Sequence, residues 1–159
     1  MRVSAVAYFA ESLEQAKELS YKVTAISHNH PEGIKGAEAT AVATYLALRG
    51  KPKEEIKEYI TQNYYPLDFT LDEIRPAYKF DVSCKGSVPQ ALEAFFESTD
   101  FEDAIRNAIS IGGDSDTIAA ICGSVAGAFY GVSDNIKKFI LNKLDDFLRE
   151  KLAEIEKAV

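Results

Sequence analysis

The sequence has 159 residues, a formal net charge of −7 and an apolar fraction of 47%. A chain of this length fits one compact domain, which we place at residues 1–159, and it can bury roughly two-thirds of its unfolded surface without a disulfide scaffold. The acidic balance, with no basic block, argues against nucleic acid as a partner, and no apolar stretch reaches the length of a membrane span.

Helical periodicity dominates the first part of the chain. Ser12 is a candidate N-cap for a helix over residues 13–27, whose apolar side chains recur at helical spacing. The stretch HNHPEG at residues 28–33 then interrupts this helix, because its proline and glycine disfavour continuation. A second helix is expected over residues 34–50, with Gly50 as its C-terminal glycine.

The middle of the chain mixes helix signals with one irregular stretch. A helix is expected over residues 51–65, with Pro52 at its start. Thr70 and Glu73 have the spacing of a capping box. The stretch AYKFDVSCKGSVPQ, residues 77–90, is the least helical part, and we expect a long loop there. Its aromatic residues either line a ring-binding cleft or pack in the core.

The last part of the chain is again helical. The apolar spacing predicts four further helices, over residues 90–98, 101–110, 117–131 and 132–159. A glycine inside a helix costs up to about 1 kcal/mol relative to alanine. Gly123 and Gly127 share one helix face, so we expect another helix to pack closely against it. Few alternating apolar runs exist to build a sheet, and the sequence therefore predicts an all-α bundle.

The stretch GGDSDT, residues 112–117, combines two glycines with oxygen donors just before a predicted helix. The glycines allow backbone angles and close approaches that other residues resist. The carboxylates of Asp114 and Asp116 and the hydroxyl of Thr117 suit Mg²⁺, Mn²⁺ or Ca²⁺ better than zinc. The alternative is structural: Asp116 or Thr117 caps the helix while Asp114 shapes the turn. The spacing alone leaves both interpretations open.

The histidines and cysteines do not form a zinc site. His28 and His30 are the only histidines, and no cysteine or third histidine completes a ligand set with them. Their imidazoles either hydrogen-bond a phosphate or ribose oxygen of a ligand or serve only local structure. Cys84 and Cys122 have no metal-binding spacing, so we expect free thiols and a cytoplasmic protein.

Several stretches, taken in order, resemble the ADP-ribosylglycohydrolase family. They are SHNHPEGIKGAEATA at residues 27–41, GSVPQALEAFF at 86–96, TDFEDAIRNAIS at 99–110 and IGGDSDTIAAICGSVAGAFYG at 111–131. The resemblance covers most of residues 1–131. It implies a compact orthogonal helical bundle and a binuclear Mg²⁺ or Mn²⁺ site. It also implies metal-dependent hydrolysis of the N- or O-glycosidic bond that links ADP-ribose to an acceptor.

The same resemblance assigns roles to particular residues. Asp114, Asp116 and Thr117 match the family's C-terminal metal-ligand motif, so the resemblance implies that the two aspartates are catalytic through the ions they hold. His28 matches a position that contacts ADP-ribose in relatives. Gly113 matches the turn that presents the ligands, and we expect it to lie against the substrate.

The family's N-terminal half has no counterpart in this sequence. In the family, that half carries a Thr-Asp-Asp ligand run, and a Gly-Asn-Gly turn directly precedes a segment like MRVSAVAYF. The chain therefore resembles a truncated, C-terminal portion of the family fold that opens at an internal methionine. Exposed apolar faces would follow, and we expect a homodimer or a complementing chain. The alternative to an enzyme is a non-catalytic module that binds ADP-ribose or another nucleotide.

Overall fold

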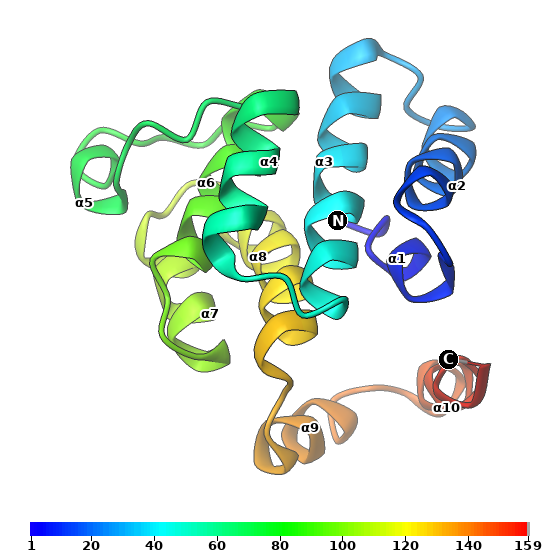
Figure 1. Ribbon diagram of the computed structural model, residues 1–159. Helices are drawn as coiled ribbons and strands as arrows, with labels where there is room; N and C mark the ends of the chain where they lie inside the picture. The colour runs from blue at the N-terminus through cyan, green and yellow to red at the C-terminus, as the bar shows by residue number, and fades with distance from the viewer. Residues whose placement is uncertain (159) are drawn as a thin grey trace.

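The computed structural model describes residues 1–158, and within them it contains ten helices and no strand (Figure 1). The prediction of an all-α bundle is therefore confirmed. The helices are α1 (Ala5–Phe9), α2 (Leu13–Ala25), α3 (Pro31–Leu48), α4 (Lys53–Asn63), α5 (Leu71–Ile74), α6 (Cys84–Phe96), α7 (Phe101–Ser110), α8 (Ser115–Tyr130), α9 (Asp134–Leu141) and α10 (Asp146–Ala158).

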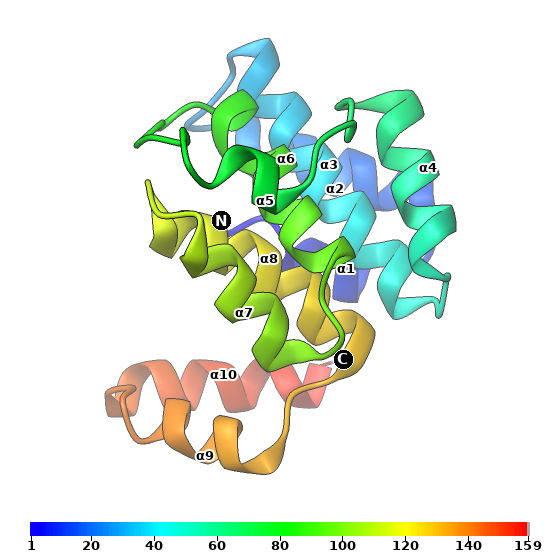
Figure 2. The ribbon, with the colours of Figure 1, turned by 90° about the vertical axis from the view of Figure 1, so that its left-hand side faces the viewer.

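Three helices, α3, α6 and α8, pack against one another at the centre of the bundle (Figures 1 and 2). Helices α1, α2 and α4 pack on α3, while α7 covers α6 and α8. Helix α3 is rich in alanine, glycine and threonine, and it is buried along most of its length. The hydroxyls of Thr40 and Thr44 donate to carbonyls one turn earlier, at 2.9 and 2.8 Å, so both polar groups are satisfied in the core.

Several predicted helix boundaries are confirmed by their capping contacts. The Ser12 hydroxyl accepts a hydrogen bond from the first turn of α2. Thr70 and Glu73 form the predicted capping box at α5. Gly50 follows α3 with a φ of 70°, and Pro52 is the residue that precedes α4. These signals are local in the sequence, which is why the sequence alone is enough to find them.

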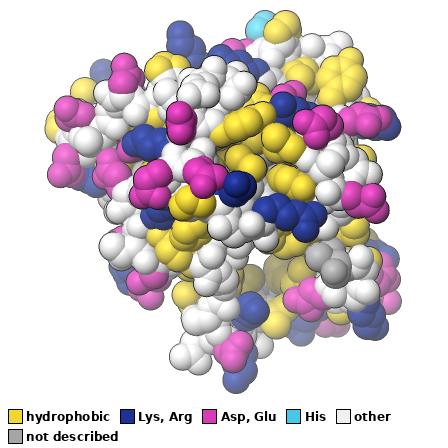
Figure 3. All heavy atoms as spheres, in the orientation of Figure 1, with side chains coloured by type: hydrophobic (Ala, Val, Ile, Leu, Met, Phe, Trp, Pro, Cys, Tyr) yellow, Lys and Arg dark blue, Asp and Glu magenta, His cyan; other side chains and the backbone are white. Residues whose placement is uncertain are grey.

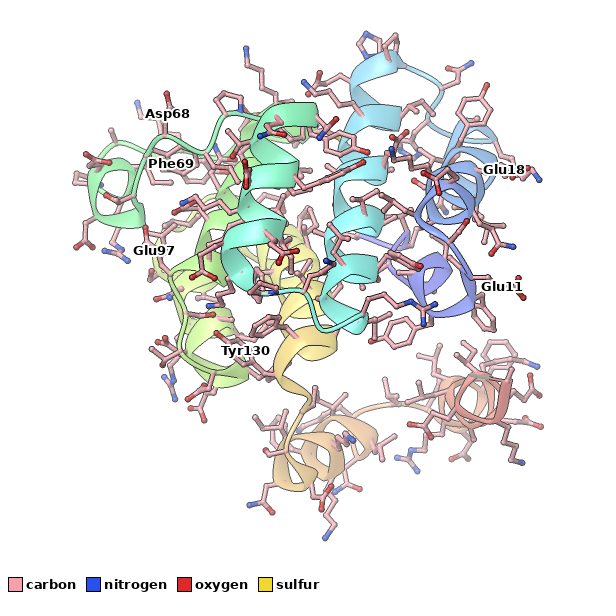
Figure 4. All side chains as sticks on the ribbon, in the orientation of Figure 1. Glu11, Glu18, Asp68, Phe69, Glu97 and Tyr130 are labelled. Atoms are coloured by element: carbon pink, nitrogen blue, oxygen red, sulfur yellow. The ribbon has the colours of Figure 1, made fainter. Side chains whose placement is uncertain are left out.

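Lys53, the first residue of α4, connects this helix to the end of α6. Its ammonium group donates to the carbonyl oxygens of Phe95, Phe96 and Ser98. It also lies over the rings of Phe95 and Tyr130, 4.9 and 5.1 Å from their centroids. The Tyr130 hydroxyl, at the end of α8 (Figure 4), donates to the Ser98 carbonyl at 2.7 Å. One cation thus fastens α4, α6 and α8 together.

The expected loop over residues 77–90 is wrong in its second half, because α6 begins at Cys84. The Ser83 side chain caps α6 by accepting a hydrogen bond from the Gly86 N–H at 3.0 Å. Pro89 lies inside the helix and costs it one backbone hydrogen bond. This proline is buried in the core of the bundle.

The single long helix expected over residues 132–159 is also wrong. The chain forms α9 and α10 with a break at residues 142–145, and Val159 lies outside the described residues. The Asp145 carboxylate accepts a hydrogen bond from the Leu148 N–H at 2.8 Å, which starts α10 anew. Neither helix buries a side chain, and both lie apart from the bundle (Figures 1 and 2). Their exposed apolar side chains are Phe139, Ile140, Leu141, Phe147, Leu148 and Ile155.

Of the two glycines on one face of α8, only Gly123 marks a close contact with a neighbouring helix. A Cβ on Gly123 would lie 2.9 Å from the Ile105 side chain of α7, so the helices are close there. A Cβ on Gly127 would meet only ordinary contacts, the nearest at 3.6 Å. The tighter approach of two helices is at Gly36 of α3, where a Cβ would lie 2.7 Å from the Cβ of Cys84 in α6.

The surface mixes charges and exposed apolar groups. Acidic and basic side chains are interspersed on the face shown in Figure 3, with hydrophobic side chains between them. Across residues 1–158, no helix has both the length and the apolar character needed to cross a membrane.

Candidate functional site

A cavity of about 460 Å³ lies where the N-terminal parts of α3, α6 and α8 meet the start of the chain and the end of α2. The first turns of helices carry unpaired N–H groups and the positive end of the helix dipole, so their convergence favours an anionic ligand. Most of the lining is apolar. The polar side chains that reach it include Arg2, His28, Thr40, Ser83, Asp114 and Thr117.

Asp114 enters the cavity from the turn between α7 and α8. This turn places Gly112 and Gly113 at φ values of 75° and 65°, which glycine adopts at little cost. Asp114 is the N-cap residue of α8, yet its side chain accepts no hydrogen bond from the helix. The Asp116 carboxylate does accept a first-turn N–H of α8, that of Thr117, as the structural alternative expected, while the Asp114 carboxylate stays available to the cavity.

Asp116 and Thr117 lie in the first turn of α8, next to Asp114. Thr117 lines the cavity, whereas Asp116 is exposed and lies outside the lining. The Asp116 carboxylate accepts the Thr117 N–H at 2.9 Å. Its second oxygen is a hard ligand beside Asp114.

These three residues fit one side of a divalent cation site. Carboxylate and hydroxyl oxygens are suitable ligands for Mg²⁺ or Mn²⁺. In the described part of the chain, no three histidine, cysteine, aspartate or glutamate side chains come close enough to hold a metal ion. The other ligands would have to come from water, from substrate or from another chain.

The two histidines have different surroundings. His28 lines the cavity, and its Nδ1 lies 2.8 Å from the Ser27 hydroxyl, which in turn contacts the Arg2 guanidinium. Nε2 of His28 is the ring nitrogen left for a ligand. His30 instead caps α3, since its Nδ1 accepts the Glu32 N–H at 3.2 Å, and it does not line the cavity. Helix α3 therefore begins at residue 31, earlier than expected.

The cavity brings together three of the five predicted site residues, His28, Asp114 and Thr117. Asp116 lies beside them, outside the lining. Gly113 is not part of the lining either. A Cβ on it would point at the ring of Tyr78, 2.4 Å from Cε1, so its contact is with the loop before α6.

Sequence reasoning missed Arg2 and Ser83 as cavity residues, and Cys84 lines the cavity as well. Arg2 is a lone cation in an apolar stretch, which is the one sequence signal that marks it. Burial, followed by the nearby Glu32 carboxylate, raises the pKa of the Cys84 thiol. Cys84 therefore stays a neutral thiol and is unsuited to act as a nucleophile.

Comparison with known proteins shows which family has this fold. The ADP-ribosylglycohydrolase family model matches residues 1–159. ADP-ribosylarginine hydrolase Tri1 of Pseudomonas putida (strain GB-1) is 31% identical over an alignment of 116 residues, and the match covers 69% of this chain and 31% of the relative. ADP-ribosylhydrolase ARH3 of Homo sapiens is 28% identical over an alignment of 115 residues, and the match covers 65% of this chain and 32% of the relative.

A solved structure of an ADP-ribosylglycohydrolase-related protein complex superposes with a TM-score of 0.65 and 27% identity. The superposition covers 96% of this chain and 54% of that one, and the chain spans about a third of the length of the two curated relatives above. Since the family model matches the whole chain and the fold agrees, the chain belongs to the ADP-ribosylglycohydrolase family.

Proposed function

We propose that this chain contributes to a metal-dependent ADP-ribosyl hydrolase, which cleaves the N- or O-glycosidic bond between ADP-ribose and an acceptor. The observation that carries the proposal is the cavity in which Asp114 and Thr117 meet His28. Two relatives are named for hydrolysis of ADP-ribosyl linkages, which supports the same activity here. The free thiols of Cys84 and Cys122 accord with a cytoplasmic setting.

The catalytic part of the proposal rests on the start of α8. Asp114, Asp116 and Thr117 would hold Mg²⁺ or Mn²⁺, in a binuclear site once further ligands are supplied. A divalent cation there would orient the ribose hydroxyls and lower the pKa of a bound water. Breaking the glycosidic bond builds positive charge on the ribose ring. The anionic Asp114 and Asp116 would stabilise that charge, which is why we assign both a catalytic role.

The substrate-binding part rests on other residues that line the same cavity. Nε2 of His28 would bond a phosphate or ribose oxygen, with Nδ1 already held by Ser27. The Arg2 guanidinium and the three helix N-termini would attract the diphosphate. Gly113 remains a predicted contact, through its backbone alone.

Release of ADP-ribose tests the proposal. The chain is incubated with an ADP-ribosylated protein and Mg²⁺, beside the variants Asp114→Ala and Asp68→Ala. Asp68 is an exposed acid outside the cavity (Figure 4) and serves as the matched control. We expect Asp114→Ala to lose about 100-fold in rate and Asp68→Ala to match the parent. No release by the parent chain, or equal release by Asp114→Ala, contradicts independent activity.

A second candidate function is a non-catalytic module that binds ADP-ribose or a related nucleotide. It is favoured by the incomplete ligand set within residues 1–158. Titration calorimetry with ADP-ribose, with and without Mg²⁺, separates the two candidates. Heat in both titrations without hydrolysis supports the module, and no heat in either removes binding as a role.

We also propose that the chain works with a complementing chain or as a homodimer. A second cavity, of about 450 Å³, adjoins the first and is lined by Arg2, Ala5, Val6, Val23, Ile26 and Ser27. The Ile26 side chain there is 89% exposed, and exposed apolar groups of this kind mark interaction surfaces. Sedimentation velocity tests the homodimer, and a clean monomer at high concentration contradicts it. Restored ADP-ribose release on adding a chain that carries a Thr-Asp-Asp run tests complementation.

A further inference from the structure

Tyr78 lies in the loop between α5 and α6. It contacts the start of α6 and the turn before α8, two segments that contribute residues to the cavity lining. Its hydroxyl donates to the carbonyl of Gly86, in the first turn of α6, at 2.7 Å. Its ring lies against Gly113, in the turn that leads into α8. Figure 2 shows this loop beside that turn. One side chain therefore spans the gap between α6 and the residue before Asp114.

The α6 end of this contact is fixed by a set of hydrogen bonds. The Asp81 carboxylate accepts the Ser83 N–H at 2.7 Å, and the Ser83 hydroxyl accepts the Gly86 N–H at 3.0 Å. The Ser87 hydroxyl lies 3.1 Å from the Asp81 carbonyl and 2.9 Å from that of Ser83. A Cβ on Gly86 would lie 2.1 Å from the Asp81 carboxylate, so the loop is seated closely on the helix.

The α8 end has no comparable support of its own. The Asp114 side chain makes no capping bond to α8, and Gly112 and Gly113 are both at positive φ. A Cβ on Gly113 would meet Tyr78 Cε1 at 2.4 Å and the Lys79 carbonyl at 3.2 Å. The loop that carries Tyr78 is therefore the packing partner of this turn.

The Tyr78 hydroxyl remains a donor over the working pH range. Burial, with the nearby carboxylates of Asp81 and Asp114, raises the pKa of Tyr78 above its ordinary value of 10.0. The group is protonated at neutral pH, and its bond to the Gly86 carbonyl persists.

We propose that Tyr78 is a positioning residue: it braces the Gly112–Gly113 turn against the start of α6 and so fixes Asp114 at the cavity. The effect of Tyr78 on metal or substrate binding rests on the proposed function. The packing of Tyr78 against the turn does not, because it is present in the chain without any ligand.

Hydrogen exchange in the full chain tests the brace directly. The N–H groups of Gly112 and Ile118 are bonded to the carbonyls of Ile109 and Asp114, so they report on opening of the turn. We expect Tyr78→Ala to speed exchange over residues 112–118 by about tenfold through local opening, with α2 unchanged. Tyr78→Phe keeps the ring against the turn and should restore most of the protection.

Tyr64→Ala is the matched control. Tyr64 is also partly buried, and its hydroxyl donates to Glu38 at 2.7 Å, away from the cavity. It should leave exchange over residues 112–118 unchanged. Parent-like exchange in Tyr78→Ala, or equal acceleration in Tyr64→Ala, overturns the brace. If Tyr78→Ala does not fold, Tyr78→Leu replaces it.

Binding of Mn²⁺ alone, followed by electron paramagnetic resonance, tests the consequence for Asp114. If the parent chain binds Mn²⁺, we expect about tenfold weaker binding in Tyr78→Ala, as for other residues that orient metal ligands, and near-parent binding in Tyr78→Phe. Equal binding in Tyr78→Ala overturns the positioning role. If the parent binds no Mn²⁺, the proposal that this chain alone binds metal is contradicted. The hydrogen-exchange measurement still tests whether Tyr78 braces the turn.

Discussion

The central helices and the C-terminal pair α9 and α10 differ in how well an apolar stripe in the sequence predicts burial in the structure. Helix α9 has a sharp apolar stripe but no buried residue, and Phe139 is 65% exposed. Helices α3 and α8 carry small and apolar residues around much of their circumference and lie at the centre of the bundle. A stripe of large apolar residues covers one neighbour, whereas small residues let several neighbours approach at once. In this bundle, the apolar stripe of α9 does not by itself indicate burial, and the small residues of α3 and α8 accompany their central packing.

The largest expected loss of stability comes from a substitution at the centre of the bundle. Phe95 of α6 is fully buried, and its ring packs edge-on against those of Phe129 and Tyr130. Phe95→Ala should lower the free energy of unfolding by about 3–5 kcal/mol, from lost burial and the cavity left behind. Urea titration followed by circular dichroism measures this. A loss below about 1 kcal/mol would mean that the centre is less tightly packed than the helix contacts indicate.

The next effect concerns close approach of the central helices. Gly36→Ala should cost about 1–3 kcal/mol, because the new Cβ overlaps Cys84 of α6. Gly127→Ala is the matched control, since its Cβ finds ordinary space and alanine favours a helix by up to about 1 kcal/mol. Thermal melts of both variants give the comparison. Destabilisation of similar size in the two would contradict the role of Gly36.

A smaller effect comes from the charge buried in the centre. Glu93 is 2% exposed, pairs with Lys57 at 2.7 Å, and leaves Oε2 without a hydrogen-bond partner. Burial raises the pKa of Glu93 above its ordinary value of 4.5. Its contribution to stability is therefore fully present below pH 4.5 and is lost as pH rises through the folded-state pKa.

Glu93→Gln should remove this pH dependence, so the parent loses up to about 1 kcal/mol relative to the variant as pH rises to neutral. Urea titrations at several pH values measure the difference. Glu154→Gln in α10 breaks the exposed pair with Lys151 and serves as the control, with an expected effect of about 0.5 kcal/mol or less. A parallel pH profile for parent and Glu93→Gln would show that Glu93 ionises normally.

The smallest expected effect is in the C-terminal pair. Phe139→Ser changes a large side chain of α9 that is mostly exposed, so the free energy of unfolding should shift by less than about 0.5 kcal/mol. The urea midpoint at low protein concentration measures it. A loss comparable with that of Phe95→Ala would show that α9 packs on the bundle in solution.

Local sequence signals predict much of the fold. Caps such as Ser12 and Thr70 act on N–H groups within three residues, and so they are visible in the sequence. The failures concern burial. Pro89 indicates a loop by its local chemistry, yet its position in the core makes it part of α6. The break between α9 and α10 depends on the cap formed by Asp145, which a continuous apolar stripe conceals.

At the candidate site, too, local sequence signals identify some residues, and contacts between distant segments bring in others. Asp114 and Thr117 belong to one local motif, and both line the cavity. Arg2 reaches it only because the bundle brings the start of the chain to Ser27, at the end of α2. Tyr78 contacts Gly113 across 35 positions of sequence in the same way. Such contacts depend on how the helices pack, and spacing along the chain does not encode them.

The contact of Lys53 with the end of α6 has a consequence for substitution. A positive charge in the first turn of a helix opposes that helix's own dipole, so Lys53 is unfavourable for α4. Its ammonium group instead neutralises the carbonyl end of α6, where three oxygens converge on one nitrogen. A planar guanidinium cannot aim three donors inward from a single centre, so arginine is not an equivalent replacement here. Lys53 belongs to α4 in the sequence, but its charge stabilises the C-terminal end of α6.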